Sequence, residues 1–385
     1  MGDLTPEDAA LHGLPELRHG PPWVMEDMIA AQPSIPAPLH GQDGIAALGA
    51  AVARAVAAGR LVTVVGCGTS EHSAHAVAEL LNEAVEQSAG RRPAVLARQA
   101  LEAALDPWGE QACVGISHEG STGATIAAMK AARDNGALTG LITANPDGSA
   151  VASADQVIQT PVRDESYCHT IGYVSPIVAG GFLAASARGA DLEPAGISGY
   201  LRAALQRGDI AAQVAASLDG AKRVITVGSG LDRVSARELA LKIEEGARTP
   251  AGAVELETLL HGHLASCDSA TAVVLMVTDP RAPRARIERA KRVLRAANRV
   301  GVRTAAILSP AAAGELGELA TTGFIETPET DLPSPVLAGL LGGAAKLQLL
   351  TVGLVHRAGH SPDLIRREHA PYREAAAMVE SSKWP

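Results

Sequence analysis

The clearest chemical pattern in the sequence is a polar turn between an apolar run and an amphipathic stretch. Val114–Ile116 is apolar, and apolar side chains recur at helical spacing from Ile126 on. The turn between them contains Ser117, His118, Glu119, Gly120, Ser121 and Thr122. A buried strand that turns in this way into a helix presents free backbone N–H groups, which bind anions. Ser and Thr are also ordinary helix N-caps, so this stretch alone leaves both interpretations open.

A second polar turn follows an earlier buried strand. Leu61–Val65 is a continuous apolar run rich in β-branched residues, and the turn after it includes Cys67, Gly68, Thr69 and Ser70. The third glycine of a dinucleotide fingerprint and the Gly-Lys-Ser/Thr ending of a P-loop are both missing, so we predict no nucleotide cofactor. Two hydroxyl-rich turns at the carboxyl ends of parallel strands can converge on one ligand.

The second half of the chain carries acid–base side chains instead of hydroxyl turns. These are Lys242, Glu244, Glu245, Glu255, Glu257, His261 and His263. Glu244, Glu255 and Glu257 are interpreted as solvated charges, since carboxylates are seldom buried without a partner. The two histidines form only a His-x-His pair, and a metal needs a third ligand, so no metal is predicted.

Composition limits the classes of partner. Aromatic residues are 2% of the 385-residue chain and the net charge is −9, which argues against nucleic acid and anionic membranes. No apolar run is expected to span a bilayer, and the acidic N-terminus does not look like a signal peptide. The four scattered cysteines are expected to be reduced thiols, so the prediction is a cytoplasmic protein.

Strand and helix patterns alternate along the chain, which predicts an α/β fold with two tandem doubly wound, flavodoxin-like parallel-sheet domains. The predicted domains are residues 43–192 and 193–360, between an N-terminal arm (1–42) and a C-terminal tail (361–385). A short helix is expected over 23–31, a linker over 189–199 and single helices over 201–218 and 235–246. The halves align as Val64–Ser70 against Thr226–Asp232, but the second copy lacks the Thr-Ser pair.

From about residue 25 on, these motifs resemble the double sugar-isomerase-domain (SIS) family. That family includes the isomerase half of glucosamine-6-phosphate synthase, sugar-phosphate deaminases and fructosamine-phosphate deglycases. Cys67–Ser70 resembles its first phosphate turn, Ile116–Thr122 its second, Ala240–Glu245 its catalytic helix and Leu260–Gly262 its ring-opening histidine turn. Glu245 and His261 stand 16 residues apart, which matches the family pattern.

The resemblance implies roles for three acid–base residues. Glu245 would be the base that moves a proton between C1 and C2 of an open sugar, and Lys242 would orient it or balance its charge. His261 would help to open the ring and in this family often comes from the neighbouring subunit. A carboxylate with a tunable pKa and an imidazole suffice for this shift without a metal.

The resemblance also implies a phosphate site made by Ser70, Ser117 and Thr122. The other expected substrate-binding residues are Cys67, Gly68, Thr69, His118, Glu119, Gly120, Ser121 and His169. Glu119 departs from the family, which has a phosphate-binding Ser there, and a carboxylate at contact distance from a dianion costs on the order of several kcal/mol. Either Glu119 turns away, or it is protonated, or the ligand is not a phosphate.

Other departures concern the two ends of the family pattern. No glutamine-hydrolysing domain is expected, and the tail position that often holds a Schiff-base Lys is occupied by Ala377, with Lys383 further on. The segment Ser166–Thr170, which contains His169, lacks the family's Ser-Thr-Lys.

The combined prediction is an aldose–ketose isomerase or deaminase for a phosphorylated hexose or amino sugar, without metal or cofactor. A homodimer with a shared active site is expected. The alternatives are a fructosamine-phosphate deglycase and a non-catalytic sugar-phosphate sensor.

Overall fold

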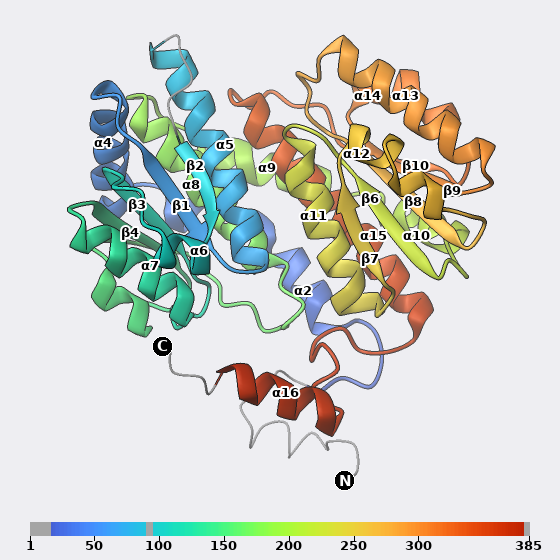
Figure 1. Cartoon of the computed structure of the whole chain (residues 1–385), viewed down its shortest axis with the longest axis horizontal. Helices are drawn as coiled ribbons and strands as arrows, with labels where there is room; N and C mark the ends of the chain where they lie inside the picture. Colours follow the sequence, from blue (N-terminus) through green and yellow to red (C-terminus); the bar gives the residue numbers. More distant parts are fainter. Residues whose placement is uncertain (1–16, 90–94, 381–385) are drawn as a thin grey trace. The chain divides into compact units, whose positions relative to one another are not determined.

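The computed structural model describes residues 17–89 and 95–380, and Figure 1 shows its helices and strands. The first 16 residues of the predicted arm and Lys383 lie outside the described residues. Two compact units are present. The first unit consists of residues 31–164 and 171–199, and the described part of the second unit consists of 17–30, 165–170 and 200–380. Each contains a parallel five-stranded sheet with flanking helices, which confirms the predicted fold class.

The first unit is built on a sheet in the order β2-β1-β3-β4-β5. Its strands are β1 (Val62–Gly66), β2 (Val95–Gln99), β3 (Ala112–Ile116), β4 (Leu138–Thr143) and β5 (Gln156–Gln159). β1 and β3 are buried along their whole length, as apolar runs in the middle of a parallel sheet must be. Their side chains alternate between two helical layers.

One face of this sheet packs against α6 (Ala100–Leu105) and α7 (Gly123–Asp134), where Val65, Cys113 and Leu141 are in the core. The other face packs against α4 (Asp43–Ala57), and helices α5 (Thr69–Ala89) and α8 (Ile171–Ala187) complete that layer.

The second unit repeats this topology. Its strands are β6 (Arg223–Val227), β7 (Ala251–Val254), β8 (Thr271–Val277), β9 (Arg303–Leu308) and β10 (Phe324–Glu326). Counted from its β7 edge the order is β7-β6-β8-β9-β10, the same succession as in the first sheet. Helices α12 (Leu256–Leu260), α13 (Arg284–Arg299) and α14 (Pro310–Leu316) belong to one layer, and α10 (Gly208–Ser217), α11 (Asp232–Lys242) and α15 (Pro335–Ala358) to the other.

The arm and the tail are tied together within the second unit. The predicted arm helix is confirmed as α2 (Val24–Ala31). The Asp363 carboxylate accepts hydrogen bonds from the N–H groups of Val24 at 3.0 Å and Met25 at 2.9 Å, so a tail residue caps an arm helix. The tail ends in a further helix, α16 (Ala370–Glu380). Residues 32–34 and 36–39 of the arm form two short helical turns.

The predicted linker over 189–199 is wrong, because α9 (Pro194–Ala204) begins inside it. Pro194 is the first helical residue, a position where its fixed φ is favourable and its missing N–H costs nothing. Ile197, Tyr200 and Leu201 are buried at helical spacing. The single helix expected over 201–218 is two helices, α9 and α10, separated where Arg207 adopts a φ of 64°.

One helix tests the expectation that no apolar run spans a bilayer. α15 has 24 residues and is apolar enough to cross a membrane, but 89% of its most apolar window is buried inside the protein. It packs against α10 and α11, so its composition is that of a central core helix.

Candidate functional site

The two polar turns of the first unit lie at the same edge of its sheet. β1 and β3 are parallel neighbours with Val65 opposite Gly115, so the turns that follow them leave the sheet side by side. The structure therefore brings Cys67–Ser70 and Ser117–Thr122 together, as the sequence predicts.

The first turn is closed by its own backbone: the Ser70 N–H donates to the Cys67 carbonyl at 3.1 Å, and the Glu71 N–H donates to the Gly68 carbonyl at 2.9 Å. Gly68 has a φ of +57°, and α5 begins directly after it at Thr69. Thr69 is buried, and Cys67 packs against the core formed by α6 and α7. Burial raises the pKa of the Cys67 thiol, so this side chain is a neutral packing group.

Two hydroxyl groups of the second turn lie within hydrogen-bond distance of each other. Ser117 Oγ and Thr122 Oγ1 are 3.1 Å apart. Thr122 is the N-cap residue of α7, but its side chain caps no described N–H group of that helix. Gly120 has a φ of +63° and packs closely on Gly148, which fixes the turn. The first turn of α7 therefore starts without the side-chain cap that the ordinary-helix interpretation requires.

His118 is a positioning residue of this turn. It is buried, and its Nε2 accepts a hydrogen bond from the Asp164 N–H at 2.8 Å. The Asp164 carboxylate accepts in turn from the Gly172 N–H at 2.9 Å. His118, which we expected to contact substrate, therefore links the turn to the loop before α8 through its Nε2.

Glu119 is paired with a cation that the sequence analysis missed. Arg163 Nε donates to Glu119 Oε1 at 3.2 Å, and Arg163 Nη2 forms an ion pair with Glu119 Oε2. The pair is bidentate, the geometry in which a guanidinium best holds a carboxylate. Arg163 follows β5 by four residues and has no motif that would reveal it. The charge of Glu119 is thus balanced locally, an arrangement outside the three that the sequence suggested.

The second unit contains a buried ionic cluster at the end of α11. Lys242 is fully buried, with its Nζ 2.5 Å from Glu245 Oε2 and 3.5 Å from Glu238 Oε1. Burial by itself would lower the pKa of Lys242, but the carboxylates of Glu245 and Glu238 outweigh it and the pKa is raised. Glu238 was missed, although its i,i+4 spacing to Lys242 is a visible signal.

A change of helix geometry places Glu245. The predicted helix over 235–246 ends as an α-helix at Lys242 and continues as a π-helical turn, η3 (Ile243–Ala247). Such turns are frequent at functional sites. The Glu245 side chain is 21% exposed, whereas Lys242 is buried. The buried ammonium therefore holds the carboxylate in place, and a ligand in solvent can still reach it.

A pocket of about 470 Å³ adjoins this carboxylate. Its lining includes Glu244, Glu245 and Arg248 from the end of the π-helical turn, and Arg366 and Tyr372 from the tail. This pocket is the candidate ligand site of the second unit.

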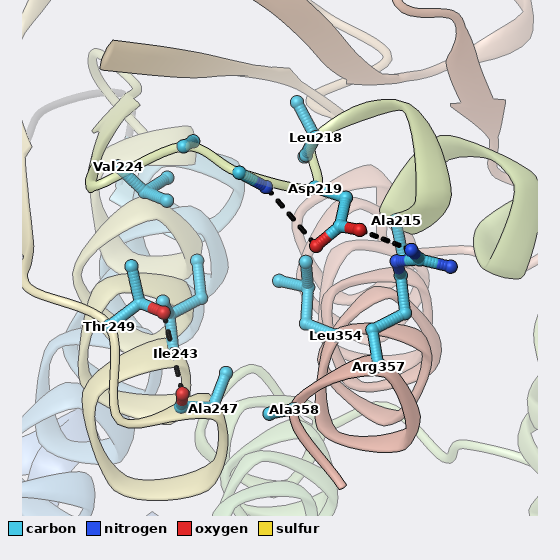
Figure 2. Close-up of a pocket in the computed structure, with 12 residues that line it drawn as sticks. Ala215, Leu218, Asp219, Val224, Ile243, Ala247, Thr249, Leu354, Arg357 and Ala358 are labelled. Atoms are coloured by element: carbon cyan, nitrogen blue, oxygen red, sulfur yellow. Dashed lines mark hydrogen bonds and ion pairs between the residues drawn. The ribbon is translucent and has the colours of Figure 1, made fainter. Parts of the chain in front are cut away.

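Figure 2 shows a smaller pocket of about 140 Å³ that also touches η3, through Ile243 and Ala247. The charged side chains that line it, Asp219 and Arg357, point toward each other and form an ion pair. Because their charges are already satisfied and the rest of the labelled lining is mostly apolar, we interpret this pocket as a packing defect.

His261 lies away from Glu245 within this unit. Its side chain is 76% exposed after the end of α12, with Nε2 3.2 Å from Glu257 Oε2. The turn with Glu245 precedes β7, whereas α12 follows it, so the two residues lie at opposite ends of that strand. A strand of this length separates its ends by about 10 Å.

His169 belongs to the segment 165–170 of the second unit. That segment is held by Gln348, whose Nε2 donates to the Thr170 carbonyl at 3.1 Å. A Cβ placed on Gly246 would meet Cys168 Sγ at 3.6 Å, so this segment packs against the π-helical turn. His169 itself is partly buried.

In the second unit, the position that corresponds to Ser70 of the first polar turn is a buried carboxylate. Asp232, aligned with Ser70, is buried after β6, and its Oδ1 accepts from the Thr278 N–H at 2.7 Å and the Thr278 hydroxyl at 2.8 Å. Thr278 follows β8 as Ser117 follows β3. Burial raises the pKa of Asp232 to about 6. Over the described ranges 17–89 and 95–380, no cluster of three His, Cys, Asp or Glu side chains could hold a metal ion.

Comparison with known proteins agrees with this geometry. The sequence model of the SIS domain family matches residues 58–186. Among curated proteins no sequence matches the chain.

Several solved structures share the fold over most of the chain. The C-terminal domain of glucosamine-fructose-6-phosphate aminotransferase from Francisella tularensis is 18% identical, with a TM-score of 0.70, over 89% of this chain and 98% of that one. Tagatose-6-phosphate ketose/aldose isomerase from Escherichia coli is 19% identical, with a TM-score of 0.69, over 91% and 97%. Glucosamine-6-phosphate deaminase from Thermotoga maritima is 19% identical, with a TM-score of 0.65, over 88% and 96%.

The TM-scores show a common fold over most of the chain, and the family match covers the segment that contains both polar turns. Residues 58–186 therefore belong to the SIS domain family, and the chain as a whole has the fold of SIS-type phosphosugar isomerases.

Proposed function

We propose that this protein is an isomerase or deaminase of a phosphorylated hexose or amino sugar, with Glu245 as the base. The observation that carries the proposal is the Lys242–Glu245 pair. A partly exposed carboxylate at the edge of a pocket is held by a fully buried ammonium 2.5 Å away. The names of the structural neighbours, which include a ketose/aldose isomerase and a deaminase, support the reaction class.

Glu245 performs the proton transfer in this proposal. Its carboxylate takes the proton from C2 of an open-chain aldose and returns it to C1, while a proton passes from the C2 hydroxyl to the C1 oxygen; the ketose undergoes the reverse. For a 2-amino sugar the same shift gives an imine at C2, which water hydrolyses to the ketose and ammonia. Lys242 fixes the carboxylate and compensates its charge in both directions. A general base must be within hydrogen-bond reach of its proton, and the exposed part of Glu245 provides that access.

The turns after β1 and β3 bind the phosphate in this proposal. Ser70, Ser117 and Thr122 contribute hydroxyl groups, and the uncapped start of α7 contributes N–H groups. Arg163 keeps the charge of Glu119 balanced when a dianion is bound.

His261 opens the ring from a second copy of the chain in this proposal. Its exposed position at the opposite end of β7 from Glu245 supports a role in the site of a partner subunit. The proposed assembly is therefore a homodimer with shared active sites.

A thermal-shift panel tests the ligand class. Hexose and hexosamine 6-phosphates are compared with the same sugars without phosphate, because a ligand that binds only the native state stabilises it, by about 2.7 kcal/mol at 100 times its Kd. We expect stabilisation by at least one phosphorylated sugar and a smaller effect of its unphosphorylated form. Equal shifts for each pair would contradict the phosphate site, and no shift from any sugar would contradict the function.

A further inference from the structure

The pocket beside Glu245 is lined by two carboxylates, Glu244 and Glu245, and by two guanidinium groups, Arg248 and Arg366. Glu244 Oε1 accepts a hydrogen bond from the Ala251 N–H at 3.2 Å. Two of its charged residues are already neutralised, Glu245 by Lys242 and Arg248 by an ion pair with Glu368. The Arg366 guanidinium forms no ion pair and no hydrogen bond with any residue in the described ranges, and its only contact of this kind is stacking on the Tyr372 ring at 4.3 Å. Its Nε is buried without a partner. A guanidinium has five N–H donors, so this pocket keeps an unused set of donors.

The tail holds Arg366 in a costly conformation. Ile365 and Arg366 have φ angles of 42° and 68°, a region that non-glycine residues avoid, especially β-branched ones. Such a conformation persists only where its surroundings impose it. The conformation is imposed from both sides, because the Asp363 carboxylate caps α2 and the Glu368 carboxylate pairs with Arg248.

We propose that Arg366 is a specificity-determining residue that binds an anionic oxygen group of the sugar derivative in this pocket. This group is a carboxylate if the turns after β1 and β3 hold the phosphate, and it is the phosphate itself if they do not. The inference rests on the proposed function for the identity of the ligand as a sugar. Arg366 binds in the bidentate manner that suits both groups. The stacking on Tyr372 fixes the plane of the guanidinium and leaves its edge, where the N–H groups lie, for the ligand.

Two matched pairs of probes separate the sources of the anion. N-(1-deoxyfructosyl)glycine and its amide differ in a carboxylate, and glucosamine 6-phosphate and glucosamine differ in a phosphate. Kd values are measured by calorimetry on the full-length wild-type protein and on Arg366→Gln, Arg366→Lys and Arg367→Gln. Arg367 is the control, because it is the adjacent arginine but stacks on Tyr167 and does not line the pocket.

In the wild type we expect the anionic member of one pair to bind more tightly than its neutral counterpart. Arg366→Gln should reduce that preference by about 10-fold or more, the amount expected for loss of a charge-assisted bidentate contact. Arg366→Lys should restore part of it, and Arg367→Gln should leave it within about 2-fold of the wild type. Melting temperatures of all variants report whether the fold is intact.

The failures are distinguishable. The role of Arg366 is overturned if the wild type and Arg366→Gln prefer the anionic probe over the neutral one by the same factor. It is also overturned if Arg366→Gln loses affinity for the neutral and the anionic probe equally. Arg366-dependent binding without any turnover contradicts the proposed function and leaves this inference standing. If the wild type binds none of the four probes, both are overturned.

Discussion

Lys242 Nζ lies 3.5 Å from Glu238 Oε1, and both side chains are fully buried. A buried charge needs a partner, and here one ammonium serves two carboxylates, because Glu245 Oε2 is also 2.5 Å away. The cluster therefore couples the stability of α11 to the position of the proposed base.

Replacing Lys242 by Met should remove activity and stability together. Two carboxylates would then share a buried site without a cation, which costs about 3–5 kcal/mol when one partner of a buried pair is deleted. Urea unfolding of Lys242→Met measures the loss. The double variant Lys242→Met/Glu238→Gln should regain part of the stability but no turnover. A single variant as stable as the wild type would show that the cluster does not hold α11.

Mixing two inactive variants should restore activity if His261 acts across subunits. Glu245→Gln and His261→Ala homodimers each lack one group in both sites, whereas a mixed dimer has one complete site. After subunit exchange at equal amounts we expect about one quarter of wild-type activity, since half of the dimers are mixed and each has one site of two. Sedimentation should show a dimer. No recovery after verified exchange would place His261 in the site of its own chain or outside the reaction.

Glu119 and Arg163 should affect phosphorylated ligands selectively. Arg163→Gln leaves the charge of the Glu119 carboxylate unbalanced in the second polar turn, so it should weaken the binding of a sugar phosphate. The effect should be at most about 5-fold, because the Glu119–Arg163 pair is exposed. The double variant Glu119→Gln/Arg163→Gln should restore the affinity for the sugar phosphate. The difference in affinity between Arg163→Gln and the wild type should shrink in 0.5 M salt because of screening. Equal weakening of phosphorylated and unphosphorylated sugars would contradict this role.

Asp232 should make the wild type less stable as the pH rises. Its pKa of about 6 lies above the ordinary value of 3.8, so the protonated form is favoured in the folded chain. The resulting contribution to the free energy of unfolding is on the order of 2–3 kcal/mol. It is fully present below pH 3.8 and is lost as the pH rises through 6. Asp232→Asn cannot ionise, so its melting temperature relative to the wild type should increase from pH 4 to pH 7. A constant difference between these pH values would refute this assignment.

Much of the fold could be predicted because local signals and global topology agree. The apolar runs Leu61–Val65 and Val114–Ile116, which we expected to be buried strands, fall at strands β1 (Val62–Gly66) and β3 (Ala112–Ile116), since short apolar runs between turns have few alternatives in an alternating pattern. α9 was missed because Pro194, Gly196 and Gly199 suggest a linker. Burial of Ile197 and Leu201 outweighs those local preferences.

The contacts of the site were less accessible from the sequence. Arg163 and Glu119 are 44 positions apart, and Arg248 meets Glu368 across 120 positions, so no local pattern links them. The π-helical turn at Ile243–Ala247 packs against α15, and no local sequence pattern marks it. Glu245 and Lys242 could be identified because both belong to one short motif.

Proton exchange in D₂O tests the central claim most directly. The protein is incubated with the hexose or hexosamine 6-phosphates that stabilise it, and NMR follows deuterium at C1 and C2. We predict incorporation with the wild type and a loss of at least 10³-fold with Glu245→Gln, within the range for removal of a general base, while the same ligands still bind. Incorporation by Glu245→Gln at the wild-type rate would contradict the assignment of Glu245 as the base.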